Sequence, residues 1–402
     1  MNDHVAVVDL GYGDAGKGTV VDALCADRPV RAVLRFNGGA QAAHNVVTDD
    51  GRHHTFAQFG AGTLRGVPTH LTRFVVVDPL ALAGEAAALG NPYHLLTVDG
   101  DALLATPWHR EAGRRREAAR GRGRHGSCGM GIGEVMAYAQ RHADAPRVSD
   151  ARSRPLLRRR LGAVADDLGP LAVPLDDVVD AFAAFARTVS IVDSSYTAEI
   201  LAAGPCVFEG AQGVLLDEWR GWHPHTTWST TTFANVEAMC SSFERLGVVR
   251  TYTTRHGAGP FVTEDASLDL PEAHNGAGAW QGAFRAGHFD AVAHRYAVEV
   301  AGGVDGLAVT HLDVPDRCPS LRVCTSYTVG GASSWDRIVP GPARDLAHQE
   351  ATTLRLWRAR PFATHRPDDW AGEIASLLGA PVVLESYGPR SVDKRMRAPI
   401  MR

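Results

Sequence analysis

The sequence predicts an α/β fold with one large, mainly parallel central sheet and flanking helices, and three observations support this. Short β-branched runs recur along the 402 residues, and they are near-continuously apolar rather than alternating. Such strands are buried on both faces, as in parallel sheets. Alanine- and leucine-rich stretches separate the runs, and alternating strands and helices are typical of α/β proteins. Glycine-rich polar segments follow several strands, at the edge where open parallel sheets bind ligands.

The expected elements follow in chain order. Strands are predicted at 4–11, 30–36, 73–78, 206–210, 248–254, 306–313 and 380–386, and helices at 19–27, 81–89, 176–188 and 287–301. The segment from about 109 to 205 is more helical and richer in Arg and Asp, so we expect a helical insertion or lid there. Because no linker separates domains, residues 1–402 are expected to form a single domain.

Composition limits the classes of partner. The net charge of -4 gives no general electrostatic case for nucleic acid or membrane binding. The basic run RRREAARGRGR at 114–124 is better explained as a solvated helix end and loop than as a polyanion site. No stretch reaches the roughly 18 apolar residues of a membrane span, and the N-terminus lacks the basic region of a secretory signal. The six cysteines form no CxxC pair, so we expect reduced thiols and a cytoplasmic protein.

The stretch GYGDAGKGT at 11–19 carries the first chemical signal. Gly11, Gly16, Lys17 and Thr19 resemble a P-loop with one extra residue, Gly18, before the threonine. Glycines let backbone N–H groups converge on phosphate oxygens, and the following helix N-terminus adds positive potential. The alternative is a tight strand-to-helix turn. The chain has only two lysines, Lys17 and Lys394, and a slim ammonium in a glycine loop can reach a phosphate where a planar guanidinium fits poorly.

Further glycine segments follow other strands, and each is weak alone. They are RFNGGAQAAHN at 35–45, GAQG at 210–213 and GPFVTED at 259–265. His44 follows the first, although a lone histidine is more often structural than catalytic.

Together these segments resemble the adenylosuccinate synthetase family from about residue 4 to residue 390. In order, the chain reads GDAGKG, RFNGGAQAAHN, FEGAQGVLLDE, RTYTTRHGAGPFVTED, GHFDAVAHRYAV, LAVTHLDV and ESYGP. The typical segments of the family read WGDEGKGK, RxxGGxNAGHT, FEGAQGxLLD, STRVGxGPFPTE, GWLDxVxxRxA, LTKLDV and STGPxR.

The resemblance implies a P-loop-type fold and a ligase that uses GTP and Mg²⁺. GTP phosphorylates the 6-oxygen of IMP, and the amine of aspartate then displaces phosphate. Asp14 matches the aspartate that takes the N1 proton of the purine and ligates Mg²⁺, and Ala43 is the other expected metal ligand. The resemblance gives catalytic roles to Asp14, Lys17, His44 and Gln212. It assigns the nucleotide to Gly11, Gly13, Gly16, Gly18, Thr19, His311, Asp313, Ser386 and Gly388, with Asp313 selecting guanine.

The largest departure from the family pattern falls on the substrate side, and smaller departures fall near the nucleotide. Gln41 replaces an asparagine near the nucleotide phosphate, Ser127 and Cys128 replace threonines, and His311 replaces a lysine that stacks on guanine. The aspartate-binding segment TTGRRRRTGWLD has become AWQGAFRAGHFD at 279–290. Only Arg285 remains of its four arginines, and Trp280 stands near a substrate threonine. The expected substrate-binding residues are Gln41, Ser127, Cys128, Arg147, Thr231, Trp280 and Arg285.

These features favour a paralogue that keeps the GTP–Mg²⁺ activation chemistry but takes another acceptor and amine, in specialised metabolism. The alternatives are a housekeeping enzyme of purine biosynthesis and a non-catalytic GTP-binding relative. The expected partners are small-molecule substrates and a second copy of the chain, in which Arg141 or Arg147 reaches the partner's nucleotide. The acceptor, the amine and the pathway stay open.

Overall fold

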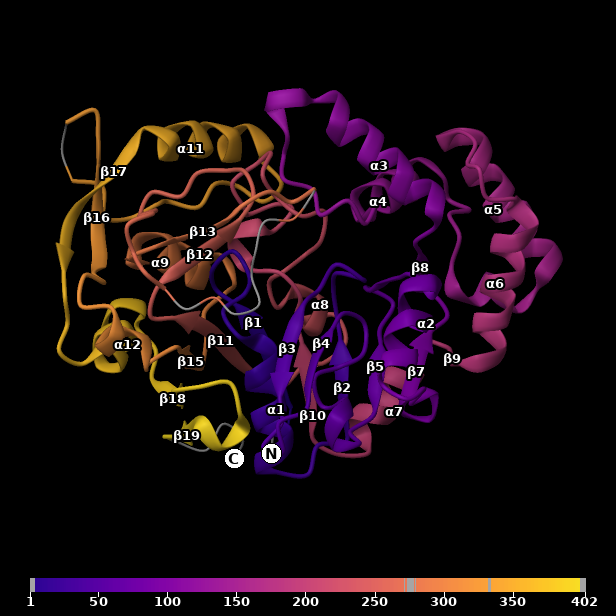
Figure 1. The fold of residues 1–402 in the computed structure, drawn as a ribbon, viewed down its shortest axis with the longest axis horizontal. Coiled ribbons are helices and arrows are strands. Elements are labelled where there is room, and N and C mark those ends of the chain that lie inside the picture. Colours follow the sequence, from indigo (N-terminus) through magenta and orange to yellow (C-terminus); the bar gives the residue numbers. More distant parts are fainter. Residues whose placement is uncertain (1–3, 271, 273–277, 279, 332–333, 398–402) are drawn as a thin grey trace.

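The computed structural model describes residues 4–270, 272, 278, 280–331 and 334–397. Within these residues a ten-stranded sheet runs in the order β19-β18-β15-β11-β1-β10-β2-β5-β7-β9 (Figure 1). Every neighbouring pair is parallel except β18 and β19. The strands are β1 Val5–Asp9, β2 Ala32–Arg35, β5 Thr69–Leu71, β7 Leu96–Asp99, β9 Ser190–Val192, β10 Cys206–Glu209, β11 Glu244–Arg250, β15 Gly306–Thr310, β18 Val382–Ser386 and β19 Lys394–Met396. The predicted α/β class with a mainly parallel sheet is confirmed.

Both faces of the sheet are buried, which explains the continuously apolar strands. In β1, Val5 and Val7 belong to one hydrophobic cluster, while Ala6 and Val8 belong to the cluster on the opposite face. The first face is covered by α1 Lys17–Asp27, α2 Pro79–Ala88, α5 Arg154–Leu168 and α6 Leu175–Thr188. The second is covered by α7 Tyr196–Ala202, α9 Ala291–Val300 and α12 Trp370–Leu378.

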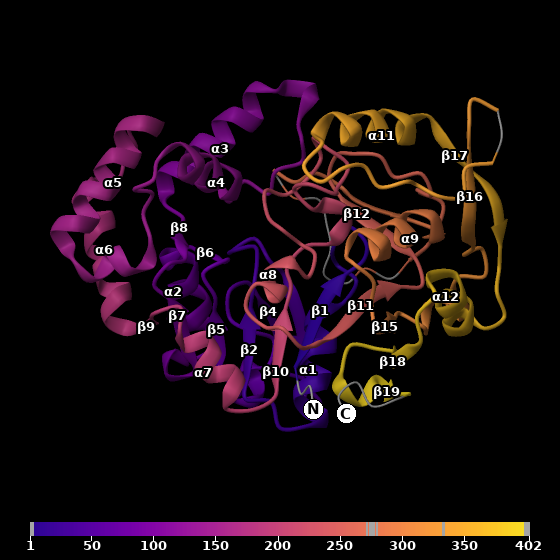
Figure 2. The same ribbon diagram turned by 180° about the vertical axis from the view of Figure 1, so that it is seen from behind.

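The range 109–205, predicted as a helical insertion or lid, is mainly helical and also contains β9 and α7. The helices before β9 are α3 Pro107–Ala119, α4 Ile132–Arg141, α5 and α6, and the chain then returns to the central sheet as β9. Helices α5 and α6 lie at one end of the long axis, and the antiparallel pair of β16 Val323–Val329 and β17 Ala359–His365 lies at the other (Figures 1 and 2).

Three predicted elements differ from the structure. The run 248–254 covers only the end of β11 and the start of a separate strand, β12. The run 73–78 gives only β6 Val76–Val77, which pairs with β8 Leu103–Leu104 outside the central sheet. The helix expected from 287 begins at Ala291, because β13 Phe284–Gly287 and β14 Phe289–Asp290 precede it and the Asp290 side chain caps it by accepting from Ala293 N. Strands β5, β7 and β9 were not predicted.

Smaller elements surround the carboxyl edge of the sheet. The hairpin of β3 His44–Val47 and β4 His53–Phe56 follows β2, and β12 Thr253–His256 pairs with β13. Short helices α8 Ala234–Glu237 and α10 Val314–Arg317 and the longer α11 Leu346–Arg358 complete the helical set. No helix in the described ranges is long and apolar enough to cross a bilayer.

The carboxyl ends of the central strands carry polar side chains. Asp9 ends β1, Arg35 ends β2, Glu209 ends β10, Arg250 ends β11 and Ser386 ends β18. All five are almost fully buried. Because parallel strands present these ends at one edge, residues far apart in the chain meet there.

Candidate active site

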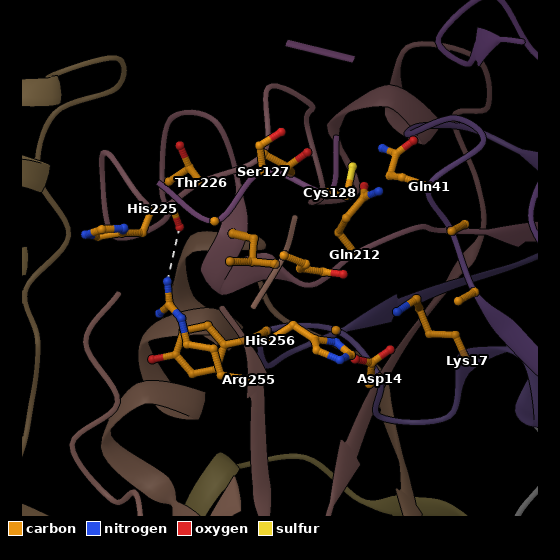
Figure 3. A pocket seen from close by; sticks show the side chains of 18 of the residues that line it. Asp14, Lys17, Gln41, Ser127, Cys128, Gln212, His225, Thr226, Arg255 and His256 are labelled. Carbon is orange, nitrogen blue, oxygen red and sulfur yellow. Dashed lines mark hydrogen bonds and ion pairs between the residues drawn. The ribbon is translucent and has the colours of Figure 1, made fainter. Parts of the chain in front are cut away.

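One large cavity of about 900 Å³ lies at this edge. It brings together most of the residues that the sequence predicts for the site. Those that line it are Gly13, Asp14, Gly16, Lys17, Gly18, Thr19, Gln41, Ala43, His44, Ser127, Cys128, Gln212, His311, Asp313, Ser386 and Gly388. Figure 3 shows Asp14, Lys17, Gln41 and Gln212 around one shared space, although they come from three segments of the chain.

The side chain of Asp9, at the end of β1, holds the glycine loop through hydrogen bonds. Its carboxylate accepts hydrogen bonds from Gly11 N at 2.8 Å, Gly13 N at 3.3 Å and Ala15 N at 2.8 Å, and it pairs with Lys17 Nζ at 3.3 Å. The N–H of Gly11 is therefore hydrogen-bonded within the loop, and Gly11 does not line the cavity. The loop then enters α1, whose N-terminus favours an anion.

Close packing requires glycine at two points around this loop. A Cβ on Gly213 would lie 2.3 Å from Gly11 O and from Gly13 N, and one on Gly18 would lie 2.8 Å from His44 Cβ. The segment GAQG is therefore pressed against the glycine loop, and His44 is pressed against the first turn of α1.

Asp14 is held at both its backbone and its side chain. It adopts a left-handed conformation with φ 61°, and its carbonyl accepts from Arg250 Nε at 2.6 Å. Its Oδ2 lies 3.0 Å from His256 Nδ1. Burial alone would raise the pKa of Asp14, but the hydrogen bond from His256 and the charges of His256, Arg250 and Lys17 outweigh it and lower the pKa. Asp14 is therefore a carboxylate at neutral pH.

His44 is oriented by Glu209. Its Nδ1 lies 2.6 Å from Glu209 Oε1, and Glu209 Oε2 accepts from Ala61 N at 2.9 Å. Burial raises the pKa of Glu209, yet the charge of Arg35 and the contact with His44 lower it further, so this group is ionised. Burial lowers the pKa of His44. A neutral His44 then keeps its proton on Nδ1, which leaves Nε2 to accept a hydrogen bond.

Two glutamines show that the cavity is built for a polar ligand. Both amide atoms of Gln41 and of Gln212 are buried and have no hydrogen-bond partner among the described residues. Gln212 also has a left-handed backbone with φ 59°. Unsatisfied buried amides are costly, so these four atoms indicate groups that a ligand would satisfy.

The end of the cavity that the sequence assigns to the nucleotide lies after β15 and β18. His311, with φ 59°, contacts Thr310 Oγ1 through Nδ1 at 3.0 Å, and burial keeps its pKa well below the ordinary value. Asp313 is paired with Arg317. Ser386 Oγ donates to Gly388 O at 3.2 Å, and Thr19 Oγ1 donates to Pro389 O at 2.6 Å. The Thr19 hydroxyl is therefore hydrogen-bonded to the loop that follows β18.

Four predicted substrate residues do not line the cavity. Arg285 donates to Gly257 O at 3.1 Å and to Gly259 O at 2.8 Å and pairs with Glu264 at 2.8 Å. Thr231 is buried and donates to Gly213 O. Arg147 donates to Asp101 O on the insertion. Trp280 lies under the guanidinium groups of Arg114 and Arg124, at 5.4 and 6.0 Å from its ring centroid. The structure therefore places these four side chains outside the cavity lining, and their expected contact with a substrate stays a prediction.

Several lining residues escaped the sequence prediction. They are Arg250, His256, Glu272 and, in the segment after GAQG, His225, Thr226 and Thr227. Arg250 pairs with Glu272, and Arg255 donates to His225 O at 3.2 Å (Figure 3). His256 had a signal in the sequence, because RTYTTRHG carries histidine where the family segment STRVG carries valine.

The residues present fit Mg²⁺ held together with a nucleotide. No group of three or more His, Cys, Asp or Glu side chains in the described ranges could hold a metal alone. Mg²⁺ typically takes one or two carboxylates plus substrate phosphates, and Asp14 is a carboxylate beside the glycine loop. Ala43 lines the same cavity and can offer only its backbone.

Comparison with known proteins agrees with this geometry. The family model described as adenylosuccinate synthetase matches residues 6–392. The adenylosuccinate synthetase of Alkalilimnicola ehrlichii is 34% identical, over 97% of this chain and 96% of its own, and that of Neisseria gonorrhoeae is 31% identical, over 97% of both chains.

Two solved structures share the fold, each at 19% identity. The fully ligated adenylosuccinate synthetase of Plasmodium falciparum matches with a TM-score of 0.84, over 98% of this chain and 100% of its own. The succinoaminodeoxyadenylate synthetase of cyanophage S-2L, bound to dGMP and dATP, matches with a TM-score of 0.63, over 100% of this chain and 97% of its own. The chain therefore belongs to the adenylosuccinate synthetase family of GTP- and Mg²⁺-dependent ligases, which form C–N bonds.

Proposed function

We propose that this protein is a GTP- and Mg²⁺-dependent ligase that phosphorylates an oxo or amide oxygen of an acceptor other than IMP and lets an amine other than aspartate displace the phosphate. We place it in specialised metabolism rather than in purine biosynthesis. The housekeeping reaction of IMP, aspartate and GTP is the alternative, and a non-catalytic GTP-binding relative is the third.

The observation that carries this proposal is the pairing of the cavity's arginines. Arg116 pairs with Glu134, Arg120 with Glu117, Arg250 with Glu272 and Arg317 with Asp313. Arg255 donates to three backbone carbonyls. Among the described lining residues, each arginine already has an acceptor. A dicarboxylate such as aspartate needs arginines that can bind its carboxylates bidentately, so this cavity is better suited to an amine with fewer anionic groups.

The activation step depends on four side chains that face the cavity. Asp14, as a carboxylate, can take a proton from the acceptor so that its oxygen becomes the stronger nucleophile. Lys17 and the N-terminus of α1 hold the phosphates, and His44 Nε2 and the Gln212 amide can hydrogen-bond the reacting oxygen. Mg²⁺, when bound, neutralises charge on the phosphates. The gathering of Asp14, Lys17, His44 and Gln212 in one cavity supports an enzyme over a non-catalytic relative.

A mass-spectrometric endpoint assay tests the proposal. Purified protein is incubated with GTP, Mg²⁺, IMP and aspartate while phosphate release is followed, and a panel of other oxo-purine acceptors and neutral amines is run in parallel. We expect no adenylosuccinate, and we expect GTP-dependent product with a member of the panel that Asp14→Ala abolishes. Adenylosuccinate formed at enzyme-like rates would establish the housekeeping reaction instead. Phosphate release by Asp14→Ala at the wild-type rate would overturn the catalytic assignment.

Two further parts of the proposal concern assembly and nucleotide choice. We propose a cytoplasmic homodimer, as expected for the family, and sedimentation velocity tests the dimer directly. We also propose that Asp313 selects guanine by accepting from its N1 and N2 groups, which requires the carboxylate to be shared with Arg317. Equal affinities for GTP and ATP would contradict that role.

A further inference from the structure

The second of the two lysines, Lys394, has no part in the mechanism above, yet it lies at the nucleotide end of the cavity. It begins β19, which pairs antiparallel with β18 through Ser386. Residues 387–393 connect the two strands, and Gly388 and Pro389 in this connection line the cavity next to Gly18 and Thr19 of α1.

The ammonium group of Lys394 ties this connection to α1. Its Nζ donates to Gly388 O and Arg390 O, both at 2.8 Å, and to the Thr19 hydroxyl. Thr19 in turn donates to Pro389 O. Three successive carbonyls, of residues 388, 389 and 390, are therefore held by two side chains.

The geometry suits lysine and no other cation. Three acceptors converge on one nitrogen, which matches the three donors of a tetrahedral ammonium, whereas a guanidinium spreads its donors over a planar fork. Every other cationic residue of the chain apart from Lys17 and the histidines is an arginine, so a lysine at this position has a stereochemical reason. Burial lowers the pKa of Lys394 to about 8, with Asp393, Asp22 and Asp49 acting in the opposite direction. The group is thus withdrawn from water to make these bonds.

We propose that Lys394 is a positioning residue for nucleotide binding, which holds the loop 386–390 against the first turn of α1 so that a purine base and its phosphates are bound at a fixed separation. This inference rests on the proposed function, because it takes the loop 386–390 as the wall of the base pocket. Lys394 does not line the cavity itself. Two of its three bonds go to carbonyls of the loop and one goes to the Thr19 hydroxyl of α1, so we expect its main effect at the base end.

Isothermal titration with two probes tests the inference. Mg²⁺–GTP carries the base, and Mg²⁺–tripolyphosphate carries only phosphates. For Lys394→Met we expect the Kd for GTP to rise about tenfold, the scale of a lost charged hydrogen bond, while the Kd for tripolyphosphate stays within twofold of the wild type. Lys394→Arg should not restore GTP binding. Val392→Ala is the matched control, because the Val392 side chain is exposed and lies in the connection 387–393. This variant should bind both probes normally.

The outcomes separate the two levels of inference. An unchanged Kd for GTP in Lys394→Met, or an equal loss for both probes, would overturn the positioning role. Thr19→Val provides a second test should Lys394→Met fail to fold, and it should weaken GTP and spare tripolyphosphate in the same way. A wild-type protein that binds tripolyphosphate but not GTP would overturn the proposed function, and this inference with it.

Discussion

At the residue scale, Asp14, the proposed proton acceptor, is fixed by its neighbours in the protein without any ligand. Its left-handed backbone is secured by Arg250, and its carboxylate is secured by His256. An aspartate in a glycine loop would otherwise sample several rotamers, and freezing it during the reaction would cost part of the rate enhancement. A hydrogen bond that exists in the free protein removes that cost.

His256→Val therefore has a specific expected effect. Valine is the residue in the family segment, so the substitution should fold, but it removes the Nδ1–H donor to Asp14 Oδ2. We expect turnover to fall about ten- to hundredfold, the scale of a charged hydrogen bond, with the Kd for GTP unchanged. Stopped assays of phosphate release, using the acceptor and amine that the product screen identifies, measure this.

His256→Asn is the control, because an amide can still donate to the carboxylate, and it should recover part of the lost rate. Turnover of His256→Val within twofold of the wild type would show that Asp14 needs no such support.

The site residues divide into those that the sequence could predict and those that it could not. Asp14, Lys17, His44 and Gln212 follow strand ends, so their meeting follows from a parallel sheet. Arg285 and Thr231 lie outside the cavity lining, and their donors go to the carbonyls of Gly257, Gly259 and Gly213. Which backbone carbonyls lie within reach of a long side chain depends on loop conformation, which the residue types alone do not determine.

At the scale of elements, apolar runs predicted the central strands well but missed the short strands β5, β7 and β9 on one side of the sheet. Strands β1, β10 and β15 are fully buried and read as continuous hydrophobic runs. Strands β5 and β9 have the sequences THL and SIV, three residues each. A run this short gives no periodicity, and its pairing is decided by the neighbouring strand rather than by its own residues.

The contact between the glycine loop and the turn after β10 gives a prediction at this scale. Gly213→Ala places a methyl group 2.3 Å from two backbone atoms of residues 11 and 13, so the loop must move. We expect GTP binding to weaken by at least about tenfold and stability to fall by roughly 1–3 kcal/mol. Calorimetric titration and urea unfolding measure the two effects.

Gly84→Ala is the matched substitution, because Gly84 lies in α2 with nothing near its Cβ position. It should raise stability by roughly 0.4–1 kcal/mol and leave GTP binding alone. Normal GTP binding by Gly213→Ala would mean that the glycine loop does not need this packing.

At the scale of the whole molecule, buried histidines contribute to how stability depends on pH, and His70 and His109 are two that lie away from the cavity. His70 is fully buried between Thr97 Oγ1 at 2.9 Å and Thr197 Oγ1 at 3.1 Å, and His109 is buried against Thr106 Oγ1 at 2.8 Å. Burial lowers the pKa of His70 to about 4 and that of His109 to about 3. Both are therefore neutral in the folded protein throughout the physiological range.

The unfolded chain protonates these histidines near pH 6.5, whereas the folded chain does not until about pH 4 or below. Their contribution to stability is complete above pH 6.5 and is lost as the pH falls toward 4. Each should remove about 1.4 kcal/mol per pH unit in this window. The lowered pKa values of Asp14 and Glu209 add little above about pH 5, because in the folded and the unfolded chain these carboxyls are mostly ionised there.

We therefore expect the free energy of unfolding to drop by at least about 2 kcal/mol between pH 6 and pH 5, as measured by urea unfolding at each pH. His109→Gln should lower stability at pH 7, because it disturbs packing against Tyr138, but its slope against pH should be smaller than that of the wild type. The difference in slope is the informative quantity, since packing losses are the same at every pH while proton uptake by the unfolded chain is not. Equal slopes for the two proteins would mean that His109 exchanges protons with solvent in the folded state, and its burial could not then be the source of the pH dependence.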